Sequence, residues 1–123
     1  MALMIRLLIL LLFTTTATAE IYCYDGDTCY VNREPIRLLG VDTPEIRNSK
    51  CGLERVKALE ARDFLNDTID NAKEVAVHVS KVRGHYGRML GYVYVDGENM
   101  SDVLIRKGYG VKYDMYNKED WCK

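Results

Sequence analysis

The stretch from Ile36 to Glu45, IRLLGVDTPE, constrains the fold more than any other part of the chain. Its apolar residues are typical of a buried strand, and Arg37 inside that strand requires an anionic partner or ligand, because an unpaired buried charge is costly. Asp42 and Glu45 follow the apolar run at once, and Pro44 favours an extended backbone at the residue before it. The stretch therefore predicts a strand that ends in a turn carrying two carboxylates.

Arg37 and Asp42 lie an odd number of positions apart, so in a regular strand their side chains face opposite sides of the sheet. For both side chains to reach one site, the strand must bulge or end close to Gly40. We predict such a break at Gly40–Val41.

Residues 1–19 have the pattern of a secretory signal peptide. One cation, Arg6, precedes an apolar run from Leu7 to Phe13, and small residues end the segment at Ala19. A membrane anchor is the alternative, but spanning a bilayer takes roughly 18 or more apolar residues, and the threonines from Thr14 onward shorten this run. We predict cleavage after Ala19, a mature domain at 20–123 without stable membrane association, and a secreted or periplasmic location.

The chain contains four cysteines: Cys23, Cys29, Cys51 and Cys122. In an exported protein two disulfides are favoured over a metal site, since the chain has no C-x-x-C motif and no paired cysteine and histidine spacing. Three pairings are possible. Cys23 and Cys29 flank a glycine turn symmetrically, which favours a bond between them and leaves Cys51 for Cys122, although the sequence keeps the other pairings open.

The overall charge argues against a polybasic protein that coats nucleic acid. Removing Arg6 from the 17 basic residues leaves 16 against 18 acidic residues, a net charge of −2. Binding of a polyanion would therefore depend on a local cluster of arginines, to which a bound cation would add positive charge.

Hydrophobic patterns, together with turn and helix-cap signals, predict five strands and two helices. The first two strands form a hairpin in Ile21–Tyr30 around an Asp-Gly-Asp turn, and the strand that contains Ile36 completes a meander. The other predicted elements are an amphipathic helix over Leu53–Ile69, strands at Glu74–Ser80 and Met89–Val95, and a short helix capped by Asn99 that runs through Arg106. The segment Tyr109–Lys123 is expected to be irregular.

Acidic and basic side chains near these turns suggest a site for phosphodiester chemistry. Asp27 and Asp42 offer hard oxygen ligands for a divalent cation such as calcium. Glu45 can activate a water molecule. Arg37 and Arg88 can hold phosphate oxygens and stabilise the charge that develops as the water attacks.

Arg88 ends a loop, Arg83–Arg88, that has two interpretations. Its two arginines, tyrosine and two glycines can hold an oxyanion, whereas the alternative is a solvated hairpin without a binding role. Neither His78 nor His85 is a convincing catalytic base, because the first lies on the outer face of a predicted strand and the second has no evident orienting partner.

Four motifs in order resemble the staphylococcal nuclease (thermonuclease) family. They are Asp25-Gly26-Asp27-Thr28, the stretch Arg37–Glu45, Tyr86-Gly87-Arg88, and Gly108 followed by Tyr113. The resemblance covers nearly the whole predicted mature chain. It implies an α+β fold, with a five-stranded OB-fold-type β-barrel and two helices after the signal peptide, and calcium-dependent cleavage of DNA and RNA to products with 3′-phosphate ends.

The same resemblance implies a role for each matching residue. Asp27, Asp42 and the backbone carbonyl of Thr43 would bind calcium, Glu45 would be the general base, and Arg37 and Arg88 would contact the phosphate. Tyr86 and Tyr113 match positions that line the nucleotide pocket in the family, and Tyr113 would touch a terminal phosphate. We expect the protein to act as a monomer on DNA and RNA.

Two departures from the family pattern and two alternatives remain. Gly84 stands where the family often has an acid, and the tail after Tyr113 is too short for the long C-terminal helix of the best-known member. One alternative is a catalytically inactive module of the same fold that binds nucleic acid or a peptide, and the other is a small disulfide-linked interaction module. The full set of acidic and arginine positions favours the enzyme over both.

Overall fold

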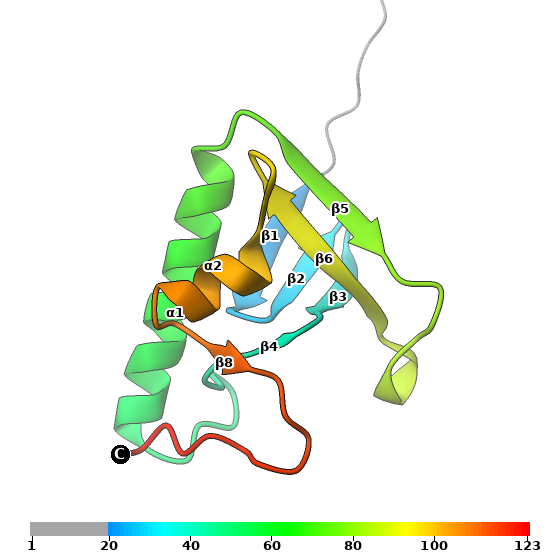
Figure 1. Ribbon diagram of the computed structural model, residues 1–123. Coiled ribbons are helices and arrows are strands. Elements are labelled where there is room, and N and C mark those ends of the chain that lie inside the picture. The colour runs from blue at the N-terminus through cyan, green and yellow to red at the C-terminus, as the bar shows by residue number, and fades with distance from the viewer. Residues whose placement is uncertain (1–19) are drawn as a thin grey trace, which may run out of the picture.

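The structure of the protein is a computed structural model that describes residues 20–123, so the predicted signal peptide at 1–19 lies outside the described residues. The chain folds into a mixed sheet and two helices, an α+β arrangement (Figure 1). In chain order the elements are β1 (Ile21–Asp25), β2 (Thr28–Val31), β3 (Glu34–Leu38), β4 (Val41–Asp42), α1 (Gly52–Asp70), β5 (Val75–Val79), the 3-10 turn η1 (His85–Gly87), β6 (Met89–Val95), β7 (Glu98–Asn99), α2 (Met100–Arg106) and β8 (Val111–Lys112).

The main sheet has the strand order β1-β2-β3-β6-β5, with the short β7 paired to β6. β1, β2 and β3 form the predicted antiparallel meander. β6 then runs parallel to β3 and antiparallel to β5. All five predicted strands are present, and β4 pairs with β8 in a separate two-stranded sheet.

The predicted five-stranded OB-fold-type barrel is confirmed only in part: the mixed sheet and the two helices agree with it, but the main sheet is not closed between β1 and β5. The outer edge of β1 is covered by helix α1 and not by another strand (Figure 1). The side-chain amide of Asn66 accepts a hydrogen bond from the Cys23 N–H at 2.7 Å and donates one to the Cys23 carbonyl at 2.9 Å. The backbone groups that a closing strand would need are thus already satisfied at this point.

The predicted break after the Ile36 strand is present, one residue earlier than expected. β3 ends at Leu38 and β4 begins at Val41, with Leu39 and Gly40 forming the turn between them. Gly40 has a φ of 82°, which a residue with a side chain rarely adopts. The turn is fixed by the hydroxyl of Ser101, which donates to the Leu39 carbonyl at 2.6 Å.

Both helices follow the predicted patterns. The buried face of α1 contains the apolar residues predicted for it, namely Ala58, Ala61, Leu65 and Ile69, together with one acid, Glu54. Of these, Leu65 and Ile69 pack into a core with strands of the main sheet and with α2. Asn99 caps α2 as predicted, since its side-chain oxygen accepts from the Ser101 N–H at 3.0 Å.

The two disulfides join Cys23 to Cys29 and Cys51 to Cys122, which confirms the favoured pairing. The first links β1 to β2 within the hairpin. The second connects the residue that caps the start of α1 to the C-terminal end of the chain, 71 residues further on. The tail is irregular apart from β8, and this bond holds it against the body of the domain.

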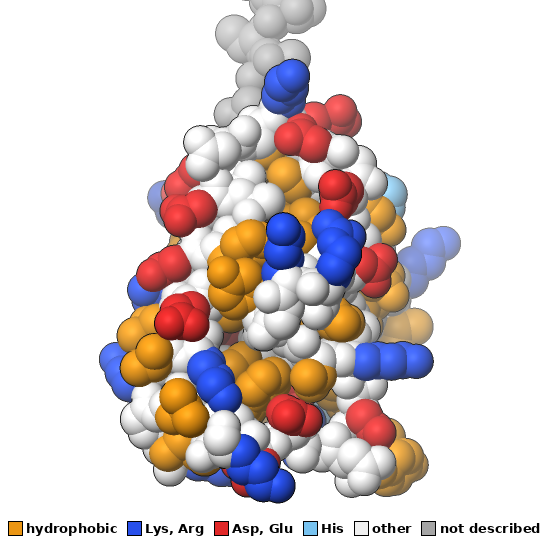
Figure 2. Space-filling view, turned by 60° about the vertical axis from the view of Figure 1, so that its left-hand side comes forward, with side chains coloured by type: hydrophobic (Ala, Val, Ile, Leu, Met, Phe, Trp, Pro, Cys, Tyr) orange, Lys and Arg blue, Asp and Glu red, His pale blue; other side chains and the backbone are white. Residues whose placement is uncertain are grey.

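The surface agrees with the near balance of charges in the sequence. Acidic and basic side chains are interspersed over the face shown in Figure 2. Within residues 20–123, no helix combines the length and the apolar character that crossing a membrane requires.

Candidate active site

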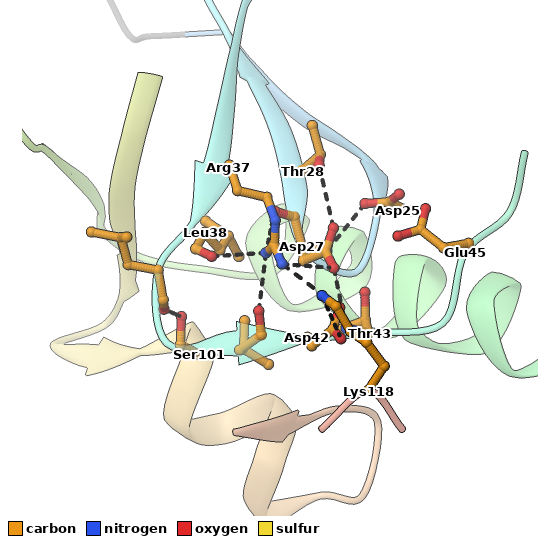
Figure 3. Close-up of polar contacts among 12 residues, drawn as sticks. Asp25, Asp27, Thr28, Arg37, Leu38, Asp42, Thr43, Glu45, Ser101 and Lys118 are labelled. Atoms are coloured by element: carbon orange, nitrogen blue, oxygen red, sulfur yellow. Dashed lines mark hydrogen bonds and ion pairs between the residues drawn. The ribbon is translucent and has the colours of Figure 1, made fainter. Parts of the chain in front are cut away.

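A pocket of about 400 Å³ lies where the first hairpin, the β3–β4 turn, the η1 loop and the C-terminal segment meet. Its lining contains most of the charged residues that the sequence singled out (Figure 3). They are Asp27, Arg37, Asp42, Glu45 and Arg88, joined by Tyr113 and by two residues that the sequence analysis did not select, Asp25 and Lys118.

Asp27 is held rigidly at the floor of the pocket. It lies in the β1–β2 turn and is only 3% exposed. Its Oδ1 accepts from the Thr28 hydroxyl at 3.3 Å, and its Oδ2 accepts from the Thr43 N–H at 3.1 Å. The turn approaches Thr43 so closely that a Cβ on Gly26 would lie 2.8 Å from that side chain, so a larger residue would displace the carboxylate.

Arg37 connects the carboxylates to the backbone of the β3–β4 turn. Its Nη1 donates to the carbonyls of Leu38 at 2.9 Å and Val41 at 3.0 Å. Its Nη2 lies 3.5 Å from Asp27 Oδ2 and 3.7 Å from Asp42 Oδ1. The hydrogen bonds from Nη1 to the backbone fix the guanidinium. Because the contacts of Nη2 with the carboxylates are longer, its N–H groups stay available to a ligand in the pocket.

Three carboxylates converge in the pocket. Asp27, Asp42 and Glu45 each offer one oxygen, and these oxygens lie within 4.8 Å of one another. Calcium binds carboxylate oxygens at about 2.3–2.6 Å, so two oxygens on opposite sides of one ion are about 5 Å apart. The spacing and the all-oxygen donor set therefore fit a hard divalent cation.

Burial and mutual repulsion perturb these acids. Desolvation raises the pKa of Asp42 above its usual range, and the Asp27 carboxylate adds to the effect. The pKa of Glu45 is raised for the same reasons, with Asp42 contributing as well. A cation among these oxygens would favour their ionised forms, because an opposite charge stabilises each carboxylate.

Thr43 is buried behind the carboxylates. Its N–H binds Asp27, as described above, while its hydroxyl has no hydrogen-bond partner among the described residues. Its backbone carbonyl, not its side chain, is the metal ligand that the family resemblance implies. The structure thus brings Thr43 beside the carboxylate cluster, in direct contact with one of its members.

The other predicted site residues differ in position. Arg88 lies just before β6, is exposed and lines the pocket, since the parallel pairing of β6 with β3 sets Leu90 opposite Arg37. The Tyr113 ring lies beneath the Arg37 guanidinium, 5.8 Å from Cζ to the ring centroid. Tyr86 is 98% exposed, with a φ of 63°, and is not among the residues described as lining the pocket.

Two pocket residues were missed by the sequence analysis. Asp25 is buried, and its Oδ1 accepts from the Asp27 N–H at 3.2 Å. Desolvation, with repulsion from Asp27, raises the pKa of Asp25 well above its usual range. Its place in the Asp-Gly-Asp motif was a usable signal. Lys118 gave none, because it lies in a segment without periodicity and reaches the pocket only through the fold.

Comparison with known proteins shows which family the chain belongs to. The family model described as "Staphylococcal nuclease homologue" matches residues 35–122. An uncharacterized protein of Bacillus anthracis is 33% identical over 92 residues, which cover 71% of this chain and 42% of that protein. The endonuclease YncB of Bacillus subtilis (strain 168) is 32% identical over 90 residues, or 68% of this chain and 42% of that protein.

A thermonuclease of Staphylococcus hyicus is 31% identical over 88 residues, which cover 68% of this chain and 52% of that protein. The chain thus spans about half the length of the curated relatives it matches, or somewhat less. The family match includes β4, both helices and all the pocket residues that follow β2. On the strength of this match, the chain belongs to the staphylococcal nuclease homologue family.

Proposed function

We propose that this protein is a secreted, calcium-dependent nuclease that hydrolyses phosphodiester bonds of DNA and RNA and leaves 3′-phosphate ends. The observation that carries the proposal is the convergence of three carboxylate oxygens within 4.8 Å beside the guanidinium of Arg37. A cation site next to a fixed arginine suits a substrate that is itself a phosphate diester. The relatives named as endonuclease and thermonuclease support the same reaction class.

The proposed reaction is attack of water on phosphorus. Glu45, exposed at the rim of the cluster, takes a proton from the water as its oxygen bonds to phosphorus. The bond between phosphorus and the 5′ oxygen breaks, and that oxygen takes up a proton to become a hydroxyl. The other product keeps the phosphate on its 3′ oxygen.

Arg37 and Arg88 stabilise the negative charge that grows on the phosphate oxygens during the attack. Arg37 suits this role because its bonds to backbone carbonyls fix the guanidinium before substrate arrives. Tyr113 supports it from below, and we assign Tyr86, on the exposed loop, to contact with the nucleotide.

Asp27, Asp42 and the Thr43 carbonyl are the proposed cation ligands. These groups would hold calcium, whose charge would polarise a phosphate oxygen as a Lewis acid. One hydrogen bond to each oxygen of Asp27 holds its carboxylate in a fixed orientation and leaves lone pairs for a cation.

The proposed location outside the cytoplasm rests on the predicted signal peptide at 1–19 and on the disulfides. Two disulfides suit an oxidising compartment such as the periplasm or the exterior of the cell. We propose that the cleaved protein is a monomer without stable membrane association.

The test is degradation of single-stranded DNA and of RNA by the purified protein with its disulfides intact. The assay is run with calcium, with magnesium and with a chelator, and the product ends are identified. Cleavage of both polymers with calcium, to 3′-phosphates, is the expected result. A folded sample that binds oligonucleotides but cleaves neither polymer would replace this proposal with the binding module.

A further inference from the structure

Lys118 reaches the pocket from the C-terminal segment. Its Nζ lies 3.9 Å from Asp42 Oδ2 (Figure 3). The same atom lies 4.9 Å from the centroid of the Tyr113 ring. The side chain is 58% exposed, so a ligand entering the pocket can meet the ammonium directly.

Two cations therefore share one aromatic ring and one carboxylate. Arg37 and Lys118 both lie over Tyr113, and they approach different oxygens of Asp42, at 3.7 and 3.9 Å. Both contacts are longer than an N–H···O hydrogen bond, which is typically about 2.7–3.2 Å. The Lys118 ammonium is thus held near Asp42 by charge alone, and it can exchange that partner for another oxyanion.

The segment that carries Lys118 is fixed at both ends. On one side, the Tyr113 N–H donates to the Gly40 carbonyl at 3.1 Å, next to the β4–β8 pair. On the other side, Cys122 is bonded to Cys51, and Lys57 of α1 donates to the Trp121 carbonyl at 3.3 Å.

A turn between these ends directs the chain back to the pocket. The Asp114 carboxylate accepts from the N–H groups of Tyr116 and Asn117, at 2.9 and 3.3 Å, and from the Asn117 amide at 3.1 Å. The segment is therefore a closed loop with an internal turn, although it has no helix or strand after β8.

We propose that Lys118 is a third phosphate-binding cation of this site, kept there by the Cys51–Cys122 disulfide. The inference rests on the proposed function and adds a substrate-binding residue to it. When a cation occupies the carboxylate cluster, Asp42 is shared with that charge, and a substrate phosphate becomes the better partner for the ammonium. Lys118 then holds the substrate strand without entering the bond-breaking step.

The test measures binding separately from catalysis. Glu45→Gln serves as the background, and a fluorescent oligothymidylate is titrated in calcium at several salt concentrations. We expect Lys118→Gln to weaken binding about tenfold at low salt, as for loss of one charged hydrogen bond. The slope of log affinity against log salt should also fall by about 0.7, the contribution of one phosphate contact in single strands.

Matched variants separate this effect from general charge. Lys118→Arg should restore binding and slope, because it keeps the cation. Lys112→Gln removes a charge from the same segment, but Lys112 is exposed and lines a different surface depression, so binding should stay at the parent level. If Lys118→Gln and Lys112→Gln behave alike, Lys118 has no specific phosphate contact.

The role of the disulfide is tested by adding Cys51→Ser and Cys122→Ser to the parent and to Lys118→Gln. Serine is itself a good N-cap, so the start of α1 is preserved. The loss of oligonucleotide affinity caused by Lys118→Gln should be smaller in the variants without the disulfide. An unchanged loss would show that the disulfide does not hold Lys118 at the site.

The two proposals fail in different ways. Cleavage by the parent, with an unaffected Lys118→Gln variant, overturns only the role of Lys118. A parent that neither cleaves nor binds nucleic acid overturns the proposed function, and the role of Lys118 with it.

Discussion

The buried carboxylate of Glu54 accepts a hydrogen bond from the backbone N–H of Glu45, 3.0 Å from Oε2. Its other oxygen accepts from the Lys50 N–H at 2.8 Å. Glu54 is 4% exposed and lies in the first turn of α1, whose cap is Cys51. The Glu54 side chain thus attaches the loop that contains Glu45, the proposed general base, to the first turn of α1.

Glu54→Ala should destabilise the protein and lower turnover. Two backbone N–H groups lose a charged acceptor, and a hydrogen bond to a charged group contributes roughly 1.5–3 kcal/mol. We expect a loss of about 2–4 kcal/mol in the free energy of unfolding, measured by urea denaturation, and a lower kcat at temperatures where the variant is folded. Glu60→Ala is the control, since Glu60 is an exposed acid of the same helix. An unfolding midpoint equal to that of the parent would show that the loop does not depend on Glu54.

Glu45→Gln should reduce turnover while leaving the fold and most of the calcium affinity intact. Glutamine keeps the size of the side chain but cannot take a proton from water, and a general base contributes roughly 10²- to 10⁴-fold to a rate. The measurements are kcat on single-stranded DNA and calcium binding by calorimetry. Turnover equal to that of the parent would remove Glu45 from the mechanism.

Asp42→Ala should weaken calcium binding itself. It removes one of the three converging oxygens and also the carboxylate shared by Arg37 and Lys118. We expect at least about a tenfold loss of affinity, because even outer-shell partners of a metal contribute roughly 10- to 100-fold. Asp63→Ala, at an exposed acid of α1, is the control in the same calorimetric titration. Parent-like affinity in Asp42→Ala would exclude this carboxylate as a ligand.

Arg37→Lys should lower kcat/KM by about 10- to 100-fold, as for loss of a charged hydrogen bond. Lysine keeps the charge but cannot bond the carbonyls of Leu38 and Val41 while also gripping a phosphate with two donors. The thermal unfolding midpoint of the same variant distinguishes two causes: it falls if the β3–β4 turn is destabilised and stays unchanged if only the phosphate contact is lost. Arg62→Lys, in a surface ion pair, is the matched control and should be neutral. Full activity in Arg37→Lys would end its assignment to the phosphate.

Much of the fold was predictable because the relevant signals are local. Hydrophobic patterns, the Asp-Gly-Asp turn and the Asn99 cap located the five main strands and both helices within a few residues. The symmetric spacing of Cys23 and Cys29 indicated the hairpin disulfide, which left one partner for Cys51. Whether the sheet closes into a barrel is not a local property, and the sheet stays open where Asn66 of α1 binds the outer edge of β1.

The residues of the candidate site also differ in whether a local sequence signal predicts them. Asp27, Arg37, Asp42 and Glu45 stand in short motifs whose charges next to strand ends suggest a site. Glu54 gave no such signal, because an acid in the first turn of a helix is common and its bonds to the preceding loop depend on how that loop folds back.

By itself the sequence determined which groups are available: carboxylates at two turns, a guanidinium in a buried strand, and a break beside Gly40. These follow from burial costs and backbone preferences that act within a few residues. Tertiary structure alone decided that β6 runs parallel to β3, which brings Arg88 to the pocket, and that Lys118 lies over Tyr113. The reason is physical: these contacts join segments far apart in the chain, and packing and a disulfide across 71 residues select them.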